Sequence, residues 1–436
     1  LTADGNFIRL FNDTTSDGYT VKENEVYLKI NSKGNIFIGD ETKKATGGIV
    51  VSSCSRTVDI NTDRGIYLNS EALDIIQVYN SGHVNINAKD DIILNVQGDG
   101  NDFGYDGYIS NVNVNYGGNQ LTNVTGLRKS SINISTDGNI VLNGKTERKL
   151  NVGIFGYGLR KNHKVTNGDE EKNKPFVDED GYVMSDENKT YLKGKKININ
   201  IGNTSSGAMG IWTKGSDKVF VDLESQEGIE LTVNSLNSQS AAINILDGNV
   251  SLKSLNGSNI VKGETGNNQS MGVGILAAVY SENDYYSNKV SFLAQKDNVI
   301  FGTTTAVAAG GKETKIDIKN IEGTNLLQSE NGDVLDVNFK GKVSLISEKG
   351  NNAIKTKTEG QKAISILSGG QVELNAGNLN EIIGNILVDG ENSLLHLTGS
   401  ASTVTSKNDI SVMEKGKIEI DSLENKVTAK LLAQTG

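Results

Sequence analysis

The stretch GHVNINAKDDIILNV, residues 82–96, carries the pattern that decides the fold. Its first half alternates apolar residues with Asn, and its second half repeats the alternation after a Lys-Asp-Asp corner. Each half therefore predicts a short strand with one apolar face, which must pack against something else. The apolar positions are Val84, Ile86, Ala88, Ile92, Leu94 and Val96.

A related motif recurs along the chain: a glycine corner, a polar residue, and then two apolar residues separated by one residue. It begins at Gly34, Gly82, Gly138, Gly248, Gly341, Gly370 and Gly416. A supersecondary unit repeated in this way indicates a solenoid, because each unit buries its apolar face only by stacking on its neighbours.

The spacing of apolar residues is most regular near the C-terminus. In two series the residues lie about 21 to 24 positions apart, within the range of solenoid repeats. Because Gly341 and Gly370 are not separated by a whole number of such repeats, we expect the strands after them to lie on different faces. The first series is Val343, Ile364, Ile386 and Ile410, and the second is Val372, Leu395 and Ile418.

Composition favours strands over helices. The 436 residues include 50 glycines and a single proline, Pro175, so nearly every residue can donate its N–H to a neighbouring strand. No long helical periodicity is evident. We therefore predict an all-β, right-handed parallel β-helix with about three short strands per coil and with loop insertions. The leucine-rich consensus and the longer blades of a propeller are not evident.

We expect three segments. Residues 1–159 would form N-terminal coils with irregular loops, residues 160–195 a hydrophilic insertion, and residues 196–436 regular coils. At about 22 residues per coil and about 4.8 Å per coil, an uninterrupted rod would have roughly 20 coils and a length of about 90 Å.

The predicted insertion holds part of an EF-hand pattern. Five residues match the loop, but Phe176 occupies the first position, where Asp is expected, and flanking helices are not evident. We therefore predict a charged loop rather than a calcium site, although calcium binding stays open. The matching residues are Asp178, Asp180, Gly181, Val183 and Glu187.

The stretch NEIIGNILVDGENSLLHLTGSASTV, residues 380–404, resembles passenger segments of monomeric autotransporters (type V secretion) of Gram-negative anaerobes. The flanking GGQVELNAG and KGKIEIDS are similar in style. The resemblance extends over most of the chain in repeat character and is sharp after about residue 340.

This resemblance implies a pectin-lyase-like β-helix displayed extracellularly, on the cell surface. In that family a signal peptide exports the chain and a C-terminal β-barrel anchors it in the outer membrane. Neither is evident here, so we expect the passenger alone or part of it, with membrane contact only through the missing barrel. The implied function is adhesion by a monomer to host cells, matrix proteins, glycans or other bacteria.

No constellation in the sequence favours catalysis. The three histidines, His83, His163 and His396, are far apart in the sequence, and no GDSG-like nucleophile turn occurs. Acidic residues are scattered, and a formal net charge of −10 disfavours nucleic acid as a partner. We expect no enzyme, no metal site and no cofactor. The alternatives are a β-helical polysaccharide lyase or hydrolase, and a passive stalk.

Aromatic residues among Asn, Asp, Ser and Gly are the candidate ligand contacts, since tyrosine beside adaptable polar residues is common on recognition surfaces. Three lie in residues 101–118 and two in residues 281–289, and the sixth is the single tryptophan. The alternative is that these rings cover coil ends and corners. The candidates are Tyr105, Tyr108, Tyr116, Trp212, Tyr285 and Tyr286.

Overall fold

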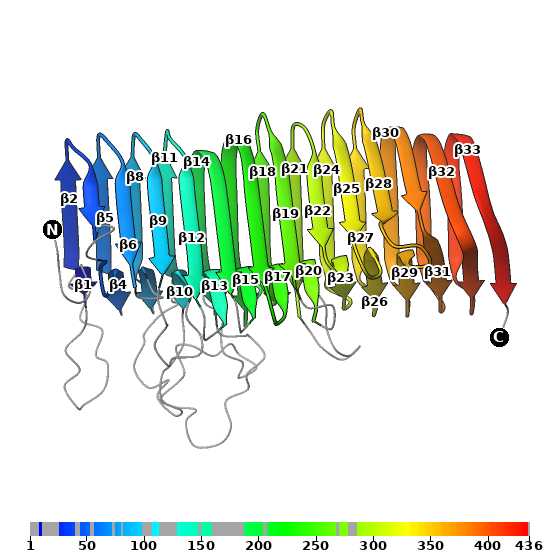
Figure 1. The fold of residues 1–436 in the computed structure, drawn as a ribbon, viewed down its shortest axis with the longest axis horizontal. Helices are drawn as coiled ribbons and strands as arrows, with labels where there is room; N and C mark the ends of the chain where they lie inside the picture. The colour runs from blue at the N-terminus through cyan, green and yellow to red at the C-terminus, as the bar shows by residue number, and fades with distance from the viewer. Residues whose placement is uncertain are drawn as a thin grey trace, which may run out of the picture.

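The structure is a computed structural model of the 436-residue chain. It describes residues 8–10, 26–39, 44–52, 56–71, 75–79, 82–97, 107–112, 129–146, 150–158, 187–203, 207–266, 270–277 and 286–434. The described residues contain strands and turns but no helix, and accordingly no helix among them is long and apolar enough to cross a membrane. Figure 1 shows the strands stacked side by side along one long axis, from blue at one end to red at the other.

All strand pairings are parallel, and over most of the rod each strand pairs with the third strand before it and the third strand after it. The pairings form three rows, in which residues stack in register. The first row contains β1 (Ile8–Leu10), β4 (Ile49–Ser52), β7 (Ile76–Tyr79), β10 (Ile109–Val112), β13 (Asn151–Tyr157), β15 (Ala208–Lys214), β17 (Ser240–Leu246), β20 (Gly272–Ala277), β23 (Thr305–Gly310), β26 (Leu335–Asn338), β29 (Lys362–Leu367) and β31 (Asn385–Asp389).

The other two rows are joined in places by long strands that continue from one row into the next. The second row contains β2 (Val26–Ser32), β5 (Arg56–Thr62), β8 (His83–Ala88), β11 (Lys129–Thr136), β18 (Gly248–Ser254), β21 (Asn288–Ala294), β24 (Lys315–Asn320) and β27 (Lys342–Ser347). The third contains β3 (Ile36–Ile38), β6 (Ile66–Ser70), β9 (Ile92–Gln97), β12 (Ile140–Thr146), β19 (Ser258–Thr265), β22 (Asn298–Gly302), β25 (Thr324–Ser329) and β28 (Asn351–Thr356). The long strands are β14 (Glu187–Asn203), β16 (Val219–Ser235), β30 (Gln371–Ile383), β32 (Leu394–Met413) and β33 (Lys417–Gln434). The last two, β32 and β33, also continue into the first row.

The strands predicted from residues 82–96 are confirmed as β8 and β9. The six apolar residues of the opening stretch are all buried, and they belong to one core cluster that continues along the rod. The fold prediction is therefore confirmed at the level of an all-β parallel solenoid.

The C-terminal spacing is confirmed for one series and corrected for the other. Val372, Leu395 and Ile418 stack in register in β30, β32 and β33. In the other series Ile364, Ile386 and Ile410 stack in register, but the residue below Ile364 is Leu335. Val343 stacks instead under Val372.

The expectation that Gly341 and Gly370 precede strands on different faces is wrong. Lys342 pairs with Gln371, and Val343 with Val372, so the two strands are neighbours in one row. The reason is that coil length varies. Between stacked residues the separation is 26 at Asn69 and Asn95 but 48 at Asn95 and Asn143. A uniform period of about 22 residues therefore overestimates the number of coils.

A ladder of buried asparagines reinforces the corner that precedes the third row. Each side chain donates to the amide oxygen of the next over 2.8 or 2.9 Å. The three central members also donate to the backbone, as Asn325 does to the Ile346 carbonyl oxygen at 3.0 Å. Stacked amides thus satisfy buried polar groups that the turning backbone leaves unpaired. The ladder contains Asn259, Asn298, Asn325, Asn352 and Asn380.

The last part of the predicted insertion at 160–195 is a strand of the solenoid. Residues 187–195 are the first part of β14 and pair with both β11 and β16. Glu187, the last residue of the partial EF-hand pattern, begins this strand. The other four residues of that pattern, Asp178, Asp180, Gly181 and Val183, lie outside the described residues.

The packing of the core predicts that shortening a buried side chain lowers the stability of the coils around it. Leu374 is fully buried between Leu345 and Leu397. We expect Leu374→Ala to lower the free energy of unfolding by about 2–5 kcal/mol, because it leaves a cavity in the stack. Hydrogen exchange of β27, β30 and β32 measures the loss. Glu373→Ala, an exposed change on the same strand, should leave exchange nearly unchanged, and equal effects would contradict this core assignment.

His83 predicts a pH dependence. Burial lowers the pKa of His83 below its usual 6.5, and its Nδ1 lies 2.9 Å from Ser131 Oγ. As pH falls through about 6.5, the unfolded chain takes up a proton that the folded chain resists. Stability should therefore be lost as pH falls, and His83→Gln should lose less between pH 7.5 and 5. Thermal unfolding of both proteins checks this, and parallel pH profiles would contradict it.

Candidate functional site

A groove crosses the outward surface of the third row, at the C-terminal ends of its strands. Its volume is about 650 Å³, and residues of β6, β9, β12, β14 and β16 line it together with Lys44. Since neighbouring strands lie about 4.8 Å apart, five strands span roughly 19 Å across the groove. The groove is therefore long enough to contact several units of an extended ligand.

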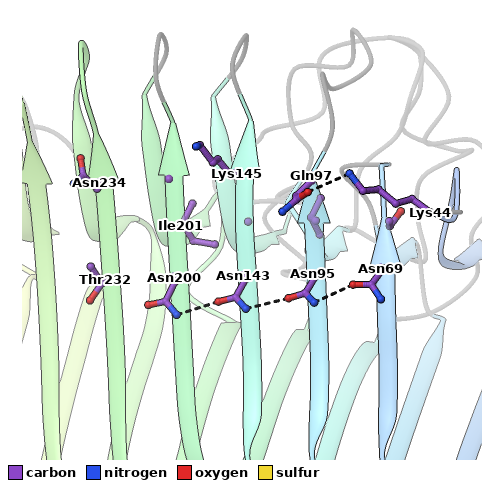
Figure 2. Close-up of a pocket in the computed structure, with 14 residues that line it drawn as sticks. Lys44, Asn69, Asn95, Gln97, Asn143, Lys145, Asn200, Ile201, Thr232 and Asn234 are labelled. Atoms are coloured by element: carbon purple, nitrogen blue, oxygen red, sulfur yellow. Dashed lines mark hydrogen bonds between the residues drawn. The ribbon is translucent and has the colours of Figure 1, made fainter. Parts of the chain in front are cut away.

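Four asparagines form a straight row along this groove (Figure 2). Asn95 donates to Asn69 at 2.9 Å, Asn143 donates to Asn95 at 3.0 Å, and Asn200 donates to Asn143 at 3.0 Å. We call these four residues the amide row. Register continues the row to Thr232 of β16.

The amide row follows from a local sequence pattern. In four strands the segment apolar-x-apolar-Asn occurs, as IYLN, IILN, IVLN and ININ. The two apolar residues point into the core, so the residue between them and the asparagine point outward. In-register pairing then brings the four asparagines together, although 26, 48 and 57 residues separate them.

Each amide in the row keeps hydrogen-bonding capacity for a ligand. Asn95 donates one N–H to Asn69 and accepts one hydrogen bond from Asn143. In the same way, Asn143 donates to Asn95 and accepts from Asn200. A side-chain amide has two N–H donors and two acceptor lone pairs. One donor and one acceptor per residue are therefore left, held rigidly by the row, which suits hydroxyl groups.

Two lysines and a glutamine form the end of the groove beyond the amide row, as Figure 2 shows. Lys44 Nζ donates to Gln97 Oε1 at 3.1 Å, and Lys145 stacks in register on Gln97. We call Lys44, Gln97 and Lys145 the donor group. Because the Gln97 oxygen accepts from Lys44, its N–H groups are the part of its amide that faces other partners.

An apolar strip runs along the other side of the amide row, two positions earlier on β6, β9 and β12. Tyr67, Ile93 and Val141 stack in register and point outward. Phe37 of β3 extends the strip, with its ring stacked on Tyr67 at a centroid distance of 5.2 Å. Phe37 is 54% exposed. Polar amides beside exposed apolar groups are the usual composition of a small-ligand site.

Tyr108, one of the predicted ligand contacts, lies beneath the groove rather than on it. Its side chain has no exposed surface, and it belongs to the core cluster. Gly144 of β12 leaves the room that the ring occupies. Burial also raises the pKa of the Tyr108 hydroxyl above its usual value. Tyr108 is therefore a core residue with no surface to offer a ligand.

Trp212, another of the predicted ligand contacts, is also buried. It points away from the main core but is only 8% exposed, in a second small cluster with Val112, Val152 and Phe155. The rings of Phe155 and Trp212 lie 5.0 Å apart between centroids. Trp212 thus stabilises the outer side of the first row.

Of the remaining predicted contacts, the structure describes one, and it lies away from the groove. Tyr286 is half-buried, just before β21 and away from the groove lining. Tyr105, Tyr116 and Tyr285 lie outside the described residues. Of the three predicted contacts that the structure describes, none is among the residues that line the groove.

The acidic groups with shifted pKa values also lie outside the groove. Burial raises the pKa of Asp222 on β16 and of Asp336 on β26, but the two residues are on different rows and neither lines the groove. Among the described residues, no three His, Cys, Asp or Glu side chains gather where a metal could bind.

Gly144 provides a test of the groove floor. A Cβ atom there would overlap the Tyr108 ring, whereas one at Gly202 on the next strand would lie 3.9 Å from its nearest neighbour, the Gly144 carbonyl oxygen. We expect Gly144→Ala to cost about 1–3 kcal/mol of stability and Gly202→Ala to cost much less. Thermal unfolding of both variants measures this, and equal unfolding temperatures would contradict the packing of Tyr108 under the groove.

Comparisons with known proteins add no further constraint. A scan against protein-family models found no match. A search of curated proteins found none, and a search of solved structures found none either. The function is therefore argued from the geometry of the groove and from the resemblance described above.

Proposed function

We propose that this chain is an adhesin: a rod that binds an extended glycan in the groove over its amide row. In this proposal the chain is the passenger of an autotransporter and is displayed on a Gram-negative cell surface. The display and the secretion route rest on the sequence resemblance, whereas the binding site rests on the groove.

The proposal includes the finer features of the fold. Pairing of each strand with the third one along the chain supports three strands per coil. A right-handed coil is the expected hand, because connections between parallel strands of one sheet are right-handed in nearly all known cases. A rod of this kind carries any outward residue pattern from coil to coil.

The amide row is the observation that carries the proposed function. Three hydrogen bonds of 2.9 to 3.0 Å fix four amides in a line, so their free donors and acceptors are ordered before a ligand arrives. Such preorganisation reduces the entropic cost of binding. A ligand with repeated hydroxyl groups matches repeated donor and acceptor pairs.

The apolar strip supports a sugar over a flexible peptide. A sugar ring has an apolar face of C–H groups and an edge of hydroxyls. The strip and the amide row run parallel on one surface, so the face could pack on Tyr67 or Ile93 while the edge meets Asn95. Aromatic rings with an exposed face are good platforms for such packing.

Binding fits the groove better than catalysis does. Among the described residues that line it, Lys44 and Lys145 alone have ionisable side chains, and none carries a carboxylate. Acid–base cleavage of a glycosidic bond by the common mechanism needs two carboxyl groups on either side of the bond. The lining chemistry therefore favours holding a ligand.

The test compares two asparagines in equivalent positions on different surfaces. Asn143→Ala removes the centre of the amide row. Asn133→Ala removes the same bond in the second row, where Asn133 donates to Asn85 at 2.8 Å. On a glycan array and by calorimetry with a glycan that binds, we expect Asn143→Ala to weaken binding about tenfold, because one hydrogen-bonding partner is worth about 1–1.5 kcal/mol.

Asn133→Ala should leave the affinity unchanged. Equal effects of the two variants would place the binding site elsewhere on the rod. An array without any binding would contradict the adhesin proposal and favour a passive stalk, and release of shortened glycan would favour the enzyme alternative.

A further inference from the structure

The lysines of the groove have no carboxylate partner among the described residues. Neither Lys44 nor Lys145 forms an ion pair with a described residue. Glu71, which follows the end of β6, lies outside the lining and pairs with neither lysine. Elsewhere the coils match charges closely, as at Lys319 and Glu348, which are 2.6 Å apart, and at Lys355 and Glu381, also 2.6 Å apart.

The donor group concentrates this unmatched charge at one place. Lys44 is held by its bond to Gln97, and Lys145 stacks on the other side of Gln97 in the next strand. Two ammonium groups therefore flank an amide whose oxygen already accepts one hydrogen bond. The three side chains together offer N–H donors and positive charge, which an anionic oxygen accepts well.

The charge of the whole chain makes this local excess more informative. The chain has 53 acidic residues and a formal net charge of −10, yet the described residues that line the groove include two lysines and no Asp or Glu. Salt screens the interaction between exposed charges beyond a Debye length of about 8 Å at physiological ionic strength. The two ammonium groups therefore attract an anion only when it is close to the groove.

We propose that the groove selects acidic glycans, whose carboxylate or sulfate groups bind the donor group while the sugar hydroxyls bind the amide row. This inference rests on the proposed function and adds the ligand class to it. Asn143 and Lys145 lie on one strand, two positions apart, so a sugar on the amide row places its acidic substituent beside the ammonium groups. Neutral glycans use the amide row alone and bind more weakly.

Nucleic acid, the other common polyanion, fits less well. Single-stranded nucleic acid binds along basic grooves that carry aromatic rings for its bases. The donor group has no aromatic residue, and the rings of Phe37 and Tyr67 lie beyond the amide row, on the far side from the lysines. A net charge of −10 also repels a long phosphate backbone.

The experiment measures binding of the full chain to four probes by calorimetry. They are hyaluronan oligosaccharides with carboxylates, heparin oligosaccharides with sulfates, carboxyl-reduced hyaluronan as the neutral match, and single-stranded oligothymidine. We expect at least one acidic glycan to bind about tenfold or more tightly than the neutral match, because a hydrogen bond to a charged group is stronger than one between neutral groups. Raising the salt concentration should weaken only the acidic probes.

Variants assign the effect to the donor group. The double change Lys44→Gln and Lys145→Gln should remove the preference, so that the acidic and the neutral glycan bind with similar affinity. Lys319→Gln, which removes an ion-paired lysine outside the groove, is the matched control and should change neither. Circular dichroism of each variant confirms that it folds, and the salt dependence of the unchanged chain tests the same point without a substitution.

The outcomes separate the two proposals. Equal binding of acidic and neutral glycans, both weakened by Asn143→Ala, would overturn the acidic preference and leave the proposed function standing. No binding of any glycan would overturn both. Tight binding of oligothymidine that the double variant abolishes would also overturn the inference, because the donor group would then serve nucleic acid. Sulfate and carboxylate arms identify which acidic group is bound.

Discussion

Parallel, in-register pairing between successive coils is the constraint on which the rest of the structure depends. A single short strand has one apolar face and two unpaired backbone edges, so it is unstable alone. The coil before it and the coil after it supply the missing hydrogen bonds, and the opposite strands of the same coil cover its apolar face. In-register stacking can therefore bring residues of one kind together, as it does for Leu345, Leu374 and Leu397 in the core.

The same rule builds the outer surface. Where the stacked residue is an asparagine, its neighbours lie within hydrogen-bonding distance, and a row forms without any dedicated loop. The protein uses this geometry in two environments. Buried at a corner, around Asn325, the amides satisfy turning backbone. On the outside, around Asn143, they are bound mainly to one another and keep donors and acceptors for a ligand.

Register survives large differences in coil length. Between Asn143 and Asn200 the chain takes 57 residues, more than twice the 26 between Asn69 and Asn95, yet all four amides remain in line. Added residues are inserted between strands, where a longer connection costs little entropy. A binding surface can therefore stay continuous across a stretch of chain that is irregular in sequence, and the groove lies in such a stretch.

The sequence by itself determined the solenoid class and which residues face inward, because alternation of apolar and polar residues is a local property that parallel stacking simply repeats. It also indicated the stacking of Val372, Leu395 and Ile418, where coil lengths are nearly equal. It could not assign Val343 to its stack, because that requires the actual length of each coil. The repeated apolar-x-apolar-Asn segments were a readable signal for the amide row, but their unequal spacing concealed that they meet.

Only the tertiary structure decided what happens to the aromatic residues. Tyr108 lies among polar residues and glycine in the sequence and Trp212 is the single tryptophan, so both were candidate contacts, but Gly144 makes room for one ring and Phe155 packs against the other. The donor group likewise joins Lys44, Gln97 and Lys145 from three separate segments. Burial and ion pairing depend on which distant residues the coils bring together, and the local sequence does not contain that information.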